Sequence, residues 1–173
     1  MKVLILYATI EGQTGKIARF VADEVQRLGH EGQRANADDT ADLSLDGVDA
    51  VILAAPVHQR RHPRSFEALV GARKAELAAR RTLMLSVSLN AAFPDGMEEA
   101  EDYLLEMNMR TGFKADRQML VAGAMRTGEY DYFASQVVRF VVMREHDYDE
   151  TLDEQEFTDW AALSAEIEAF LAA

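Results

Sequence analysis

A short hydroxyl-bearing turn near the amino terminus is the segment of this chain best suited to hold an anion. Residues 3–14 read Val-Leu-Ile-Leu-Tyr-Ala-Thr-Ile-Glu-Gly-Gln-Thr, so an apolar run leads into Thr9, Gly12 and Thr14. The threonines offer hydroxyl donors, and Gly12 lets the backbone approach a ligand closely. A helix that begins here would add unpaired N–H groups and the positive end of its dipole. The turn predicts a phosphate site; a plain strand-to-helix turn capped by Thr9 is the alternative.

Two common nucleotide-binding patterns do not fit this turn. Ile10 stands where a Gly-x-x-x-x-Gly-Lys-Ser/Thr loop needs its first glycine, and Ile17 stands where that loop needs its hydroxyl. A Gly-x-Gly-x-x-Gly pattern is also missing from this turn. Nucleoside triphosphates and dinucleotides are therefore disfavoured as ligands.

The composition restricts the chemistry that the chain can perform. A length of 173 residues with 49% hydrophobic content suffices for one well-buried domain, so we expect a single domain over residues 1–173. The chain has no cysteine, which excludes disulfides, thiol nucleophiles and cysteine-ligated iron–sulfur clusters. Any redox chemistry must come from a bound cofactor. There is no basic-then-apolar leader and no apolar run of roughly 20 residues, so we expect a cytoplasmic protein with at most peripheral membrane contact.

The formal net charge of −12 argues against nucleic acid as a partner, because phosphate backbones repel an acidic surface. The charge is unevenly distributed. Basic side chains predominate between Arg60 and Arg81, whereas residues 145–173 contain many acids and no lysine or arginine. Most of these charges are expected on solvated faces.

Apolar runs alternate with amphipathic stretches along the chain, which is typical of βαβ units and a parallel sheet. The predicted strands are Val3–Ala8, Glu31–Asn36, Ala50–Ala55, Thr82–Ser88 and Met119–Ala124. The predicted helices are Gly15–Leu28, Pro63–Ala79, Asp95–Met109 and Tyr132–Arg144, with a final helix near Trp160 capped by Thr158 or Asp159. Open sheets of this kind bind ligands outside the carboxyl ends of their strands. Three loops besides the first therefore deserve notice: Pro56–His62, Ser88–Pro94 and Met125–Asp131.

The turn at residues 9–14 resembles the phosphate loop of flavodoxin-like proteins, Ser/Thr-x-Thr-Gly-x-Thr, and the chain is more narrowly similar to the flavodoxin-type, menaquinone-dependent protoporphyrinogen IX dehydrogenases. The resemblance implies an α/β fold, the flavodoxin-like open doubly wound five-stranded parallel sheet with helices on both faces. The matching stretches span almost the whole chain: Leu4-Ile5-Leu6, Gly12-Gln13-Thr14, Ile17-Ala18, Ser65-Phe66, Ser86-Val87 with Leu89, Ala122-Gly123-Ala124-Met125-Arg126 and Thr158-Asp159-Trp160.

Flavin mononucleotide (FMN) is the cofactor that this resemblance implies. The residues that match the phosphate loop are Thr9, Glu11, Gly12, Gln13 and Thr14. Those that match the two sides of the isoalloxazine ring are Val57, His58 and Gln59 on one side and Ser88, Leu89 and Asn90 on the other. The flavin would transfer the electrons, while ring hydrogen bonds and local charge would tune its potential.

Two departures from the family pattern bear on binding. Glu11 replaces the threonine of the general flavodoxin pattern, and a carboxylate beside a phosphate lowers affinity unless it points away. Residues 145–156 are acidic where the narrower subgroup has a partly basic stretch. Such a stretch would repel an anionic membrane and a porphyrin's carboxylates.

A porphyrinogen-like acidic substrate and a quinone acceptor are the partners that the resemblance implies. Arg60, Arg61 and Arg64 begin where the third strand ends, and guanidinium groups pair well with carboxylates. Arg126, after the fifth strand, is a further candidate for substrate or flavin contact. Ion pairing with the protein's own acids is the alternative for all four. His58 and His62 are four residues apart, but Pro63 follows them, which disfavours a metal site on a helix.

Three classes of function remain open at this point. The first is an FMN-dependent dehydrogenase that passes electrons from an acidic, aromatisable substrate to a quinone. The second is an electron carrier without an organic substrate; apart from these classes, Glu11 leaves open a degenerate flavodoxin-like protein that does not bind FMN. The third, a phosphoacceptor receiver domain, fits poorly because Thr9 and Ala55 stand where that fold needs acids.

Overall fold

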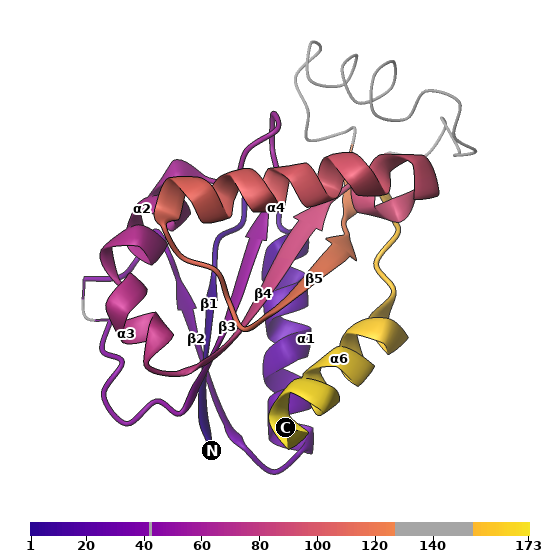
Figure 1. Cartoon of the computed structure of the whole chain (residues 1–173). Coiled ribbons are helices and arrows are strands. Elements are labelled where there is room, and N and C mark those ends of the chain that lie inside the picture. Colours follow the sequence, from indigo (N-terminus) through magenta and orange to yellow (C-terminus); the bar gives the residue numbers. More distant parts are fainter. Residues whose placement is uncertain (42, 127–153) are drawn as a thin grey trace.

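A five-stranded parallel sheet forms the centre of the molecule in the computed structural model, which describes residues 1–41, 43–126 and 154–173 (Figure 1). The strand order is β2-β1-β3-β4-β5, so the order reverses between β1 and β3. The strands are β1 (Lys2–Tyr7), β2 (Glu31–Asn36), β3 (Ala50–Pro56), β4 (Arg81–Ser88) and β5 (Arg117–Ala122). Every pairing within this sheet is parallel.

Helices cover both faces of the sheet (Figure 1). One face carries α1 (Gln13–Arg27) and α6 (Trp160–Ala172), and the other carries α2 (Arg64–Ala72), α3 (Lys74–Ala78) and α4 (Met97–Thr111). Two short 3₁₀ turns, η1 (Asn90–Ala92) and η2 (Pro94–Gly96), lead from β4 into α4. After β5 the chain forms β6 (Ala124–Arg126), which pairs antiparallel with β7 (Glu154–Glu156).

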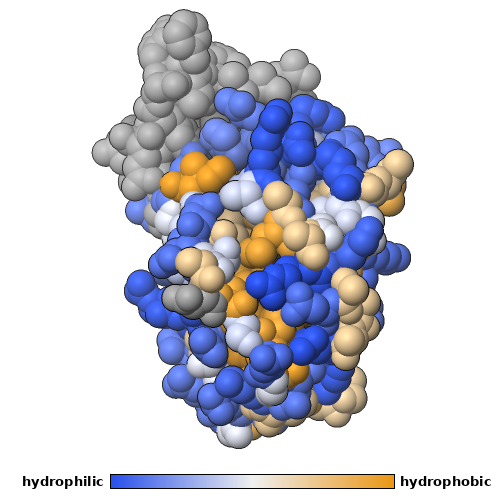
Figure 2. All heavy atoms as spheres, turned by 90° about the vertical axis from the view of Figure 1, so that its left-hand side faces the viewer, coloured by the Kyte–Doolittle hydropathy of each residue, from blue (hydrophilic) through white to orange (hydrophobic). Residues whose placement is uncertain are grey.

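The crossover from β2 to β3 has no helix among its described residues. Ala37, Leu45 and Val48 turn inward there and are almost fully buried. On this side of the molecule, which faces left in Figure 1, hydrophobic groups lie at the centre of a hydrophilic surround (Figure 2). Arg80 donates to the carbonyls of Leu45 (2.7 Å) and Val48 (3.1 Å), so a guanidinium supplies hydrogen bonds that a helix would have made internally.

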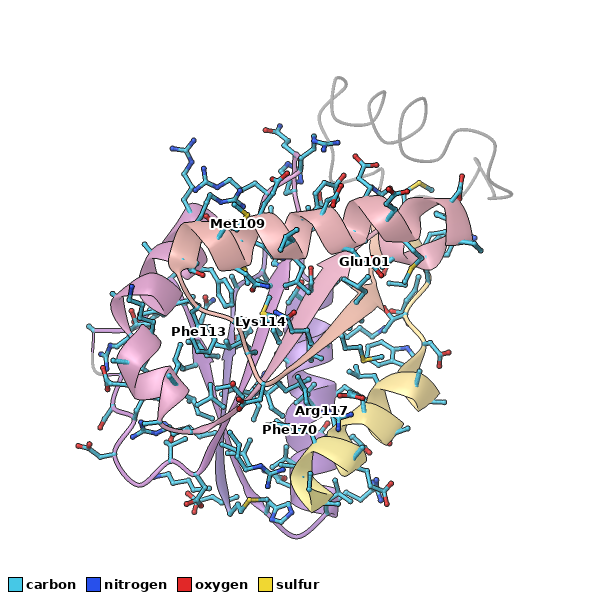
Figure 3. All side chains as sticks on the ribbon, in the orientation of Figure 1. Glu101, Met109, Phe113, Lys114, Arg117 and Phe170 are labelled. Carbon is cyan, nitrogen blue, oxygen red and sulfur yellow. The ribbon has the colours of Figure 1, made fainter. Side chains whose placement is uncertain are left out.

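The core has two halves, one on each side of the sheet. Side chains of β1 alternate between them: Val3 and Ile5 pack with α1, and Leu4 and Leu6 with α2. Phe170 of α6 belongs to the first half and Phe113, after α4, to the second (Figure 3). In β3, residues 50–55 are fully buried, because a parallel strand is covered on both faces.

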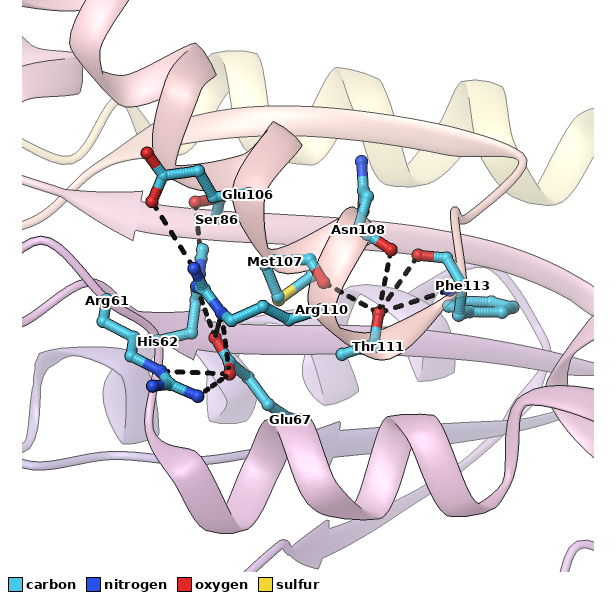
Figure 4. A network of polar contacts seen from close by, with 10 residues as sticks. All are labelled: Arg61, His62, Glu67, Ser86, Glu106, Met107, Asn108, Arg110, Thr111 and Phe113. Atoms are coloured by element: carbon cyan, nitrogen blue, oxygen red, sulfur yellow. Dashed lines mark hydrogen bonds and ion pairs between the residues drawn. The ribbon is translucent and has the colours of Figure 1, made fainter.

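One buried polar contact interrupts the second half of the core. His62 precedes α2 and is 1% exposed; its Nε2 lies 2.9 Å from Ser86 Oγ on β4 (Figure 4). Its Nδ1 is buried without a hydrogen-bond partner among the described residues. Burial disfavours the charged imidazolium and lowers the pKa of His62 to about 4, with the nearby Arg110 adding to the effect and Glu67 opposing it.

The sequence-based fold class is confirmed, with local differences. The helix expected over Pro63–Ala79 divides at Arg73 into α2 and α3. The fifth strand ends at Ala122 rather than Ala124, and Ala124 instead begins β6, which pairs with β7. Asp159 caps α6, as expected, by accepting from Ala162 N–H (3.0 Å). The helix expected at Tyr132–Arg144 lies outside the described residues.

Replacement of Arg80 by methionine should destabilise the protein by about 2–3 kcal/mol, because the carbonyls of Leu45 and Val48 lose a charged donor. Methionine keeps the apolar stem. Urea denaturation at pH 7 measures the change. Arg27→Met is the control, since Arg27 pairs with Glu24 at the surface and its loss should leave the free energy of unfolding nearly unchanged. Equal effects in the two variants would contradict the carbonyl-capping role.

The free energy of unfolding should fall as the pH drops below 6.5. In the unfolded chain His62 takes up a proton near its ordinary pKa of 6.5, whereas the folded chain does so only near 4. Between these values the unfolded state binds more protons, so the loss between pH 7 and pH 5 should reach about 2 kcal/mol. In His62→Gln this part of the pH dependence should disappear. Denaturation curves at both pH values test it, and an unchanged slope in the variant would refute it.

Candidate functional site

The loops singled out in the sequence follow strands that end side by side. Tyr7 pairs with Ala54, Pro56 with Val87, and Ser88 with Ala122, so the carboxyl ends of four strands are in register. The turn after β1 leaves the sheet next to β3, where the strand order reverses. Ligands of open α/β sheets bind at such a point.

The first loop forms a compact turn into α1. Gly12 adopts the left-handed conformation (φ 96°) that glycine tolerates, and its N–H donates to Thr9 Oγ1 (3.1 Å). A Cβ on Gly15 would lie 3.6 Å from Thr9, so the turn packs closely on the helix. The residue before α1 is Gly12, which has no side chain to cap the helix, and the first turn contains the buried Thr14. The positively polarised start of such a helix fits a phosphate.

Gln13 holds the first loop to the C-terminal part of the chain. Its Nε2 donates to Glu156 Oε2 (3.1 Å) and Thr158 Oγ1 (3.0 Å), and Thr158 in turn donates to Ala122 O (2.6 Å). The Gln13 side chain is thereby used within the protein, which leaves its backbone as the part that can face a phosphate. The β6–β7 strand pair and the turn are thus one connected unit.

Glu156 is a site neighbour that sequence reasoning recognised only as part of an acidic stretch. Its carboxylate accepts hydrogen bonds from Lys16 Nζ (2.5 Å), from Trp160 Nε1 (2.8 Å) and from the Gln13 side chain. Burial alone would raise the pKa of Glu156, but the three hydrogen bonds outweigh it and hold the pKa below its usual range. An ionised carboxylate therefore lies beside the candidate anion site and forms an ion pair with Lys16. Lys16 is separated from Glu156 by 140 residues, so no local pattern could reveal the pair.

The second loop is a tight reversal. His58 N–H donates to Arg61 O (2.9 Å), and Arg61 N–H donates to His58 O (3.2 Å). The two central residues, Gln59 and Arg60, have φ angles of 49° and 65°. The loop is anchored to β4 through Val57 N–H and Val87 O (2.7 Å). We call residues 58–61 the reverse turn.

Glu11 of the first loop faces the reverse turn, since its Oε1 lies 3.9 Å from His58 Nδ1. The carboxylate that departs from the family pattern therefore has a neighbour on the second loop. The structure brings the first two loops together as the sequence predicted.

The third loop is held rigidly. Ser88 Oγ accepts from Ala91 N–H (3.2 Å), and a Cβ on Gly96 would lie 2.4 Å from Asn90 O, so only glycine fits there. Asn90 Nδ2 donates to Glu99 (3.1 Å) and to Tyr103 Oη (3.0 Å). Leu89, between Ser88 and Asn90, is half-buried. These contacts fix the loop on α4.

Arg60 connects the reverse turn to this third loop. Its guanidinium pairs with Glu99 and lies over the ring of Tyr103, 5.3 Å from the centroid. Burial, reinforced by Glu99, raises the pKa of Tyr103 to about 12, so the phenol stays neutral. Because Arg60 is 65% exposed, it remains accessible to a ligand.

The other predicted arginines differ in their surroundings. Arg61 pairs with the buried carboxylate of Glu67 (2.7 Å). Arg64 begins α2 and is exposed, without an ion pair in the described part of the chain. Arg126 lies on β6, where its backbone pairs with Glu154; its side chain is outside the described atoms. Arg61 is therefore engaged by a buried partner, whereas Arg60 and Arg64 are exposed.

A groove of about 330 Å³ lies elsewhere, between α4 and β5. Glu101 and Lys114 line it together with apolar side chains such as Leu104 (Figure 3). No residue that the structure describes in the four predicted loops contributes to its lining. In the described residues no helix is both long and apolar enough to cross a membrane, and no three metal-ligating side chains converge.

Comparison with known proteins finds a relative by sequence and solved structures of the same fold. The chain is 26% identical to protoporphyrinogen IX dehydrogenase [quinone] of Escherichia coli K12 over 161 residues, 92% of this chain and 89% of that protein. Among solved structures, it is similar to a short-chain flavodoxin associated with a non-canonical PDU bacterial microcompartment (TM-score 0.61, 12% identity, 99% of this chain and 98% of that one). It also resembles oxidised flavodoxin 1 of Bacillus cereus (TM-score 0.59, 16% identity, 99% and 98%).

The family model named flavodoxin domain matches residues 4–153, which include the turn, the reverse turn and the third loop. This match agrees with the strand order and with the resemblance seen in the sequence. The chain belongs to the flavodoxin domain family.

Proposed function

We propose that this protein is an FMN-dependent oxidoreductase. The observation that carries the proposal is the start of α1, preceded by the left-handed Gly12, at the reversal of strand order, with two further loops anchored beside it. The phosphate would bind at Thr9, Gly12, Gln13 and Thr14, chiefly through backbone N–H groups and the Thr14 hydroxyl. Glu11, held near His58, would lie at the rim of this site.

The isoalloxazine ring would lie between the reverse turn and the third loop. Val57, His58 and Gln59 would form one wall, and Ser88, Leu89 and Asn90 the other. FMN, when bound, supplies reversible one- and two-electron transfer. The protein's task is to fix the ring, and the hydrogen bonds of Asn90 with Glu99 and Tyr103 support a rigid wall.

The proposed substrate is a porphyrinogen or a similar acidic, aromatisable molecule, with a quinone as electron acceptor. The name of the E. coli relative supports this choice. Arg60 and Arg64 are exposed near the loop ends and offer guanidinium groups to substrate carboxylates. Arg61 is already paired with Glu67, and Arg126 is proposed from its position alone. The protein would act as one domain in the cytoplasm, with at most peripheral membrane contact.

An electron carrier without an organic substrate is the second candidate. The net charge of −12 favours it, because a strongly acidic surface can steer a basic redox partner. The two candidates share the flavin and differ in turnover of a porphyrinogen.

A visible absorption titration with FMN tests both candidates at once. We expect a bound-flavin spectrum with micromolar or tighter saturation, followed by anaerobic oxidation of protoporphyrinogen when a quinone is present. Flavin binding without turnover would support the carrier. A folded protein that binds no flavin would contradict both.

Thr14→Val should weaken FMN binding by about tenfold, because the variant keeps the shape of the buried side chain but removes its hydroxyl. Riboflavin, which lacks the phosphate, should bind to both proteins with similar affinity. Fluorescence titration measures the two dissociation constants. An equal loss for FMN and riboflavin would show that Thr14 does not act on the phosphate.

Arg60→Gln should raise the KM for protoporphyrinogen by about tenfold or more with a small change in kcat, because one charged hydrogen-bonding partner of a carboxylate is lost. Steady-state anaerobic kinetics measure both constants. Arg27→Gln, on the far end of α1, is the charge-matched control. The substrate role would be wrong if both variants shifted KM alike.

A further inference from the structure

We propose that Glu67 is a positioning residue that acts through Arg61 to hold the reverse turn in the conformation that contacts the flavin. This inference rests on the proposed function, because it assigns a support to the ring-facing wall of that site. The support is a buried carboxylate clamped between two arginines from different elements.

The conformation of the reverse turn demands such a support. Gln59 and Arg60 both have positive φ (49° and 65°), a region that side chains with a Cβ occupy at a cost. Turns of this kind normally carry Asn-Gly or Gly-Gly at their centre. Two consecutive non-glycine residues persist there only if the surroundings hold them.

On one side, Glu67 restrains the reverse turn. Its side chain is 5% exposed, and its Oε2 accepts from Arg61 Nε (3.1 Å) and Nη2 (2.7 Å) (Figure 4). Arg110 of α4 donates to the same carboxylate through Nε and Nη2, with Nη2 at 2.7 Å from Oε1. The carboxylate therefore links the reverse turn to α2, which carries Glu67, and to α4.

The charges of this cluster explain its rigidity. Burial alone would raise the pKa of Glu67, but the hydrogen bonds from Arg110 and Arg61 outweigh burial and keep it below its usual range. A buried carboxylate that loses its cations is strongly unfavourable, so Glu67 favours conformations that keep Arg61 in place. The backbone of Arg61 closes the reverse turn on His58, and its side chain is thus coupled to the flavin-facing residues.

The opposite side of the turn is held more weakly. Arg60 pairs with Glu99, but both side chains are well exposed, at 65% and 42%. Exposed pairs of this kind contribute little to order. The contact of Arg61 with the buried carboxylate of Glu67 is therefore the stronger restraint on the ring-facing wall.

Limited proteolysis tests the hold without any flavin, because trypsin cleaves after Arg60 and Arg61 within the turn itself. We expect cleavage after Arg60 to become at least tenfold faster in Glu67→Gln and in Arg61→Met. The second variant keeps the Glu67–Arg110 pair and so serves if Glu67→Gln folds poorly. Unchanged protection in Arg61→Met would overturn the proposal.

Glu166→Gln is the matched control. Arg117 donates to Glu166 through Nε and Nη2, both at 2.8 Å, so the same kind of pair joins β5 to α6 away from the turn. Cleavage after Arg60 should stay within twofold of the native protein. An increase equal to that of Glu67→Gln would mean that general loosening, not the turn, is being measured, and the proposal would fail.

Flavin binding gives the second readout. The dissociation constants for FMN and for riboflavin should both rise about tenfold in Arg61→Met and Glu67→Gln, since the ring contact is disturbed and the phosphate loop is not. Loss confined to FMN, or no loss in either variant, would overturn the positioning role while the proposed function stood. If the native protein binds no flavin, the proposed function fails, and the trypsin result still decides whether Glu67 holds the turn.

Discussion

The parallel pairing of the five strands is the constraint on which the candidate site depends. Parallel strands need crossovers that return the chain to the same end, so both faces are covered and all carboxyl ends meet at one edge. Burial of residues 50–55 on both sides is the direct result. It also means that three loops far apart in the sequence, after β1, β3 and β4, arrive together without any contact that had to be encoded locally.

The proposed anion site lies in a chain of net charge −12, so a bound phosphate would have to overcome repulsion from nearby carboxylates. Glu11 and Glu156 both lie close to the start of α1, and Glu156 forms an ion pair with the Lys16 ammonium. What remains for a phosphate is mainly backbone: the N–H groups of the first turn and the helix dipole. These groups are fixed by the fold and cannot be neutralised by ion pairing, which suits a site embedded in an acidic protein.

Much of this arrangement can be predicted from the sequence, and the features that cannot be predicted are missed for identifiable reasons. Apolar runs such as Val3–Ala8 identify the strands because a buried parallel strand has no polar alternation. The strand pair β6–β7 is missed because each strand has only three residues and no pattern. Glu67 reads as an ordinary helical acid, because one of its two arginine partners, Arg110, is 43 residues away in the sequence. The role of Glu156 cannot be predicted for the same reason, because its partner Lys16 is 140 residues away.

The arginines show why charge counts do not assign function. Residues 60–81 look like one basic segment, yet their arginines have different partners. Arg80 binds main-chain carbonyls, Arg61 binds a buried carboxylate and Arg60 binds the exposed carboxylate of Glu99. Guanidinium groups suit all three tasks, because their donors form a planar fork. The task is decided by the acceptor that the fold places within reach. An arginine whose acceptor is buried contributes to structure, and one whose partner is exposed can exchange that partner for a ligand. By this criterion Arg60 could exchange Glu99 for a ligand. Arg64 is exposed and has no ion pair in the described part of the chain, and we propose that Arg61 acts on the site through the backbone that it holds.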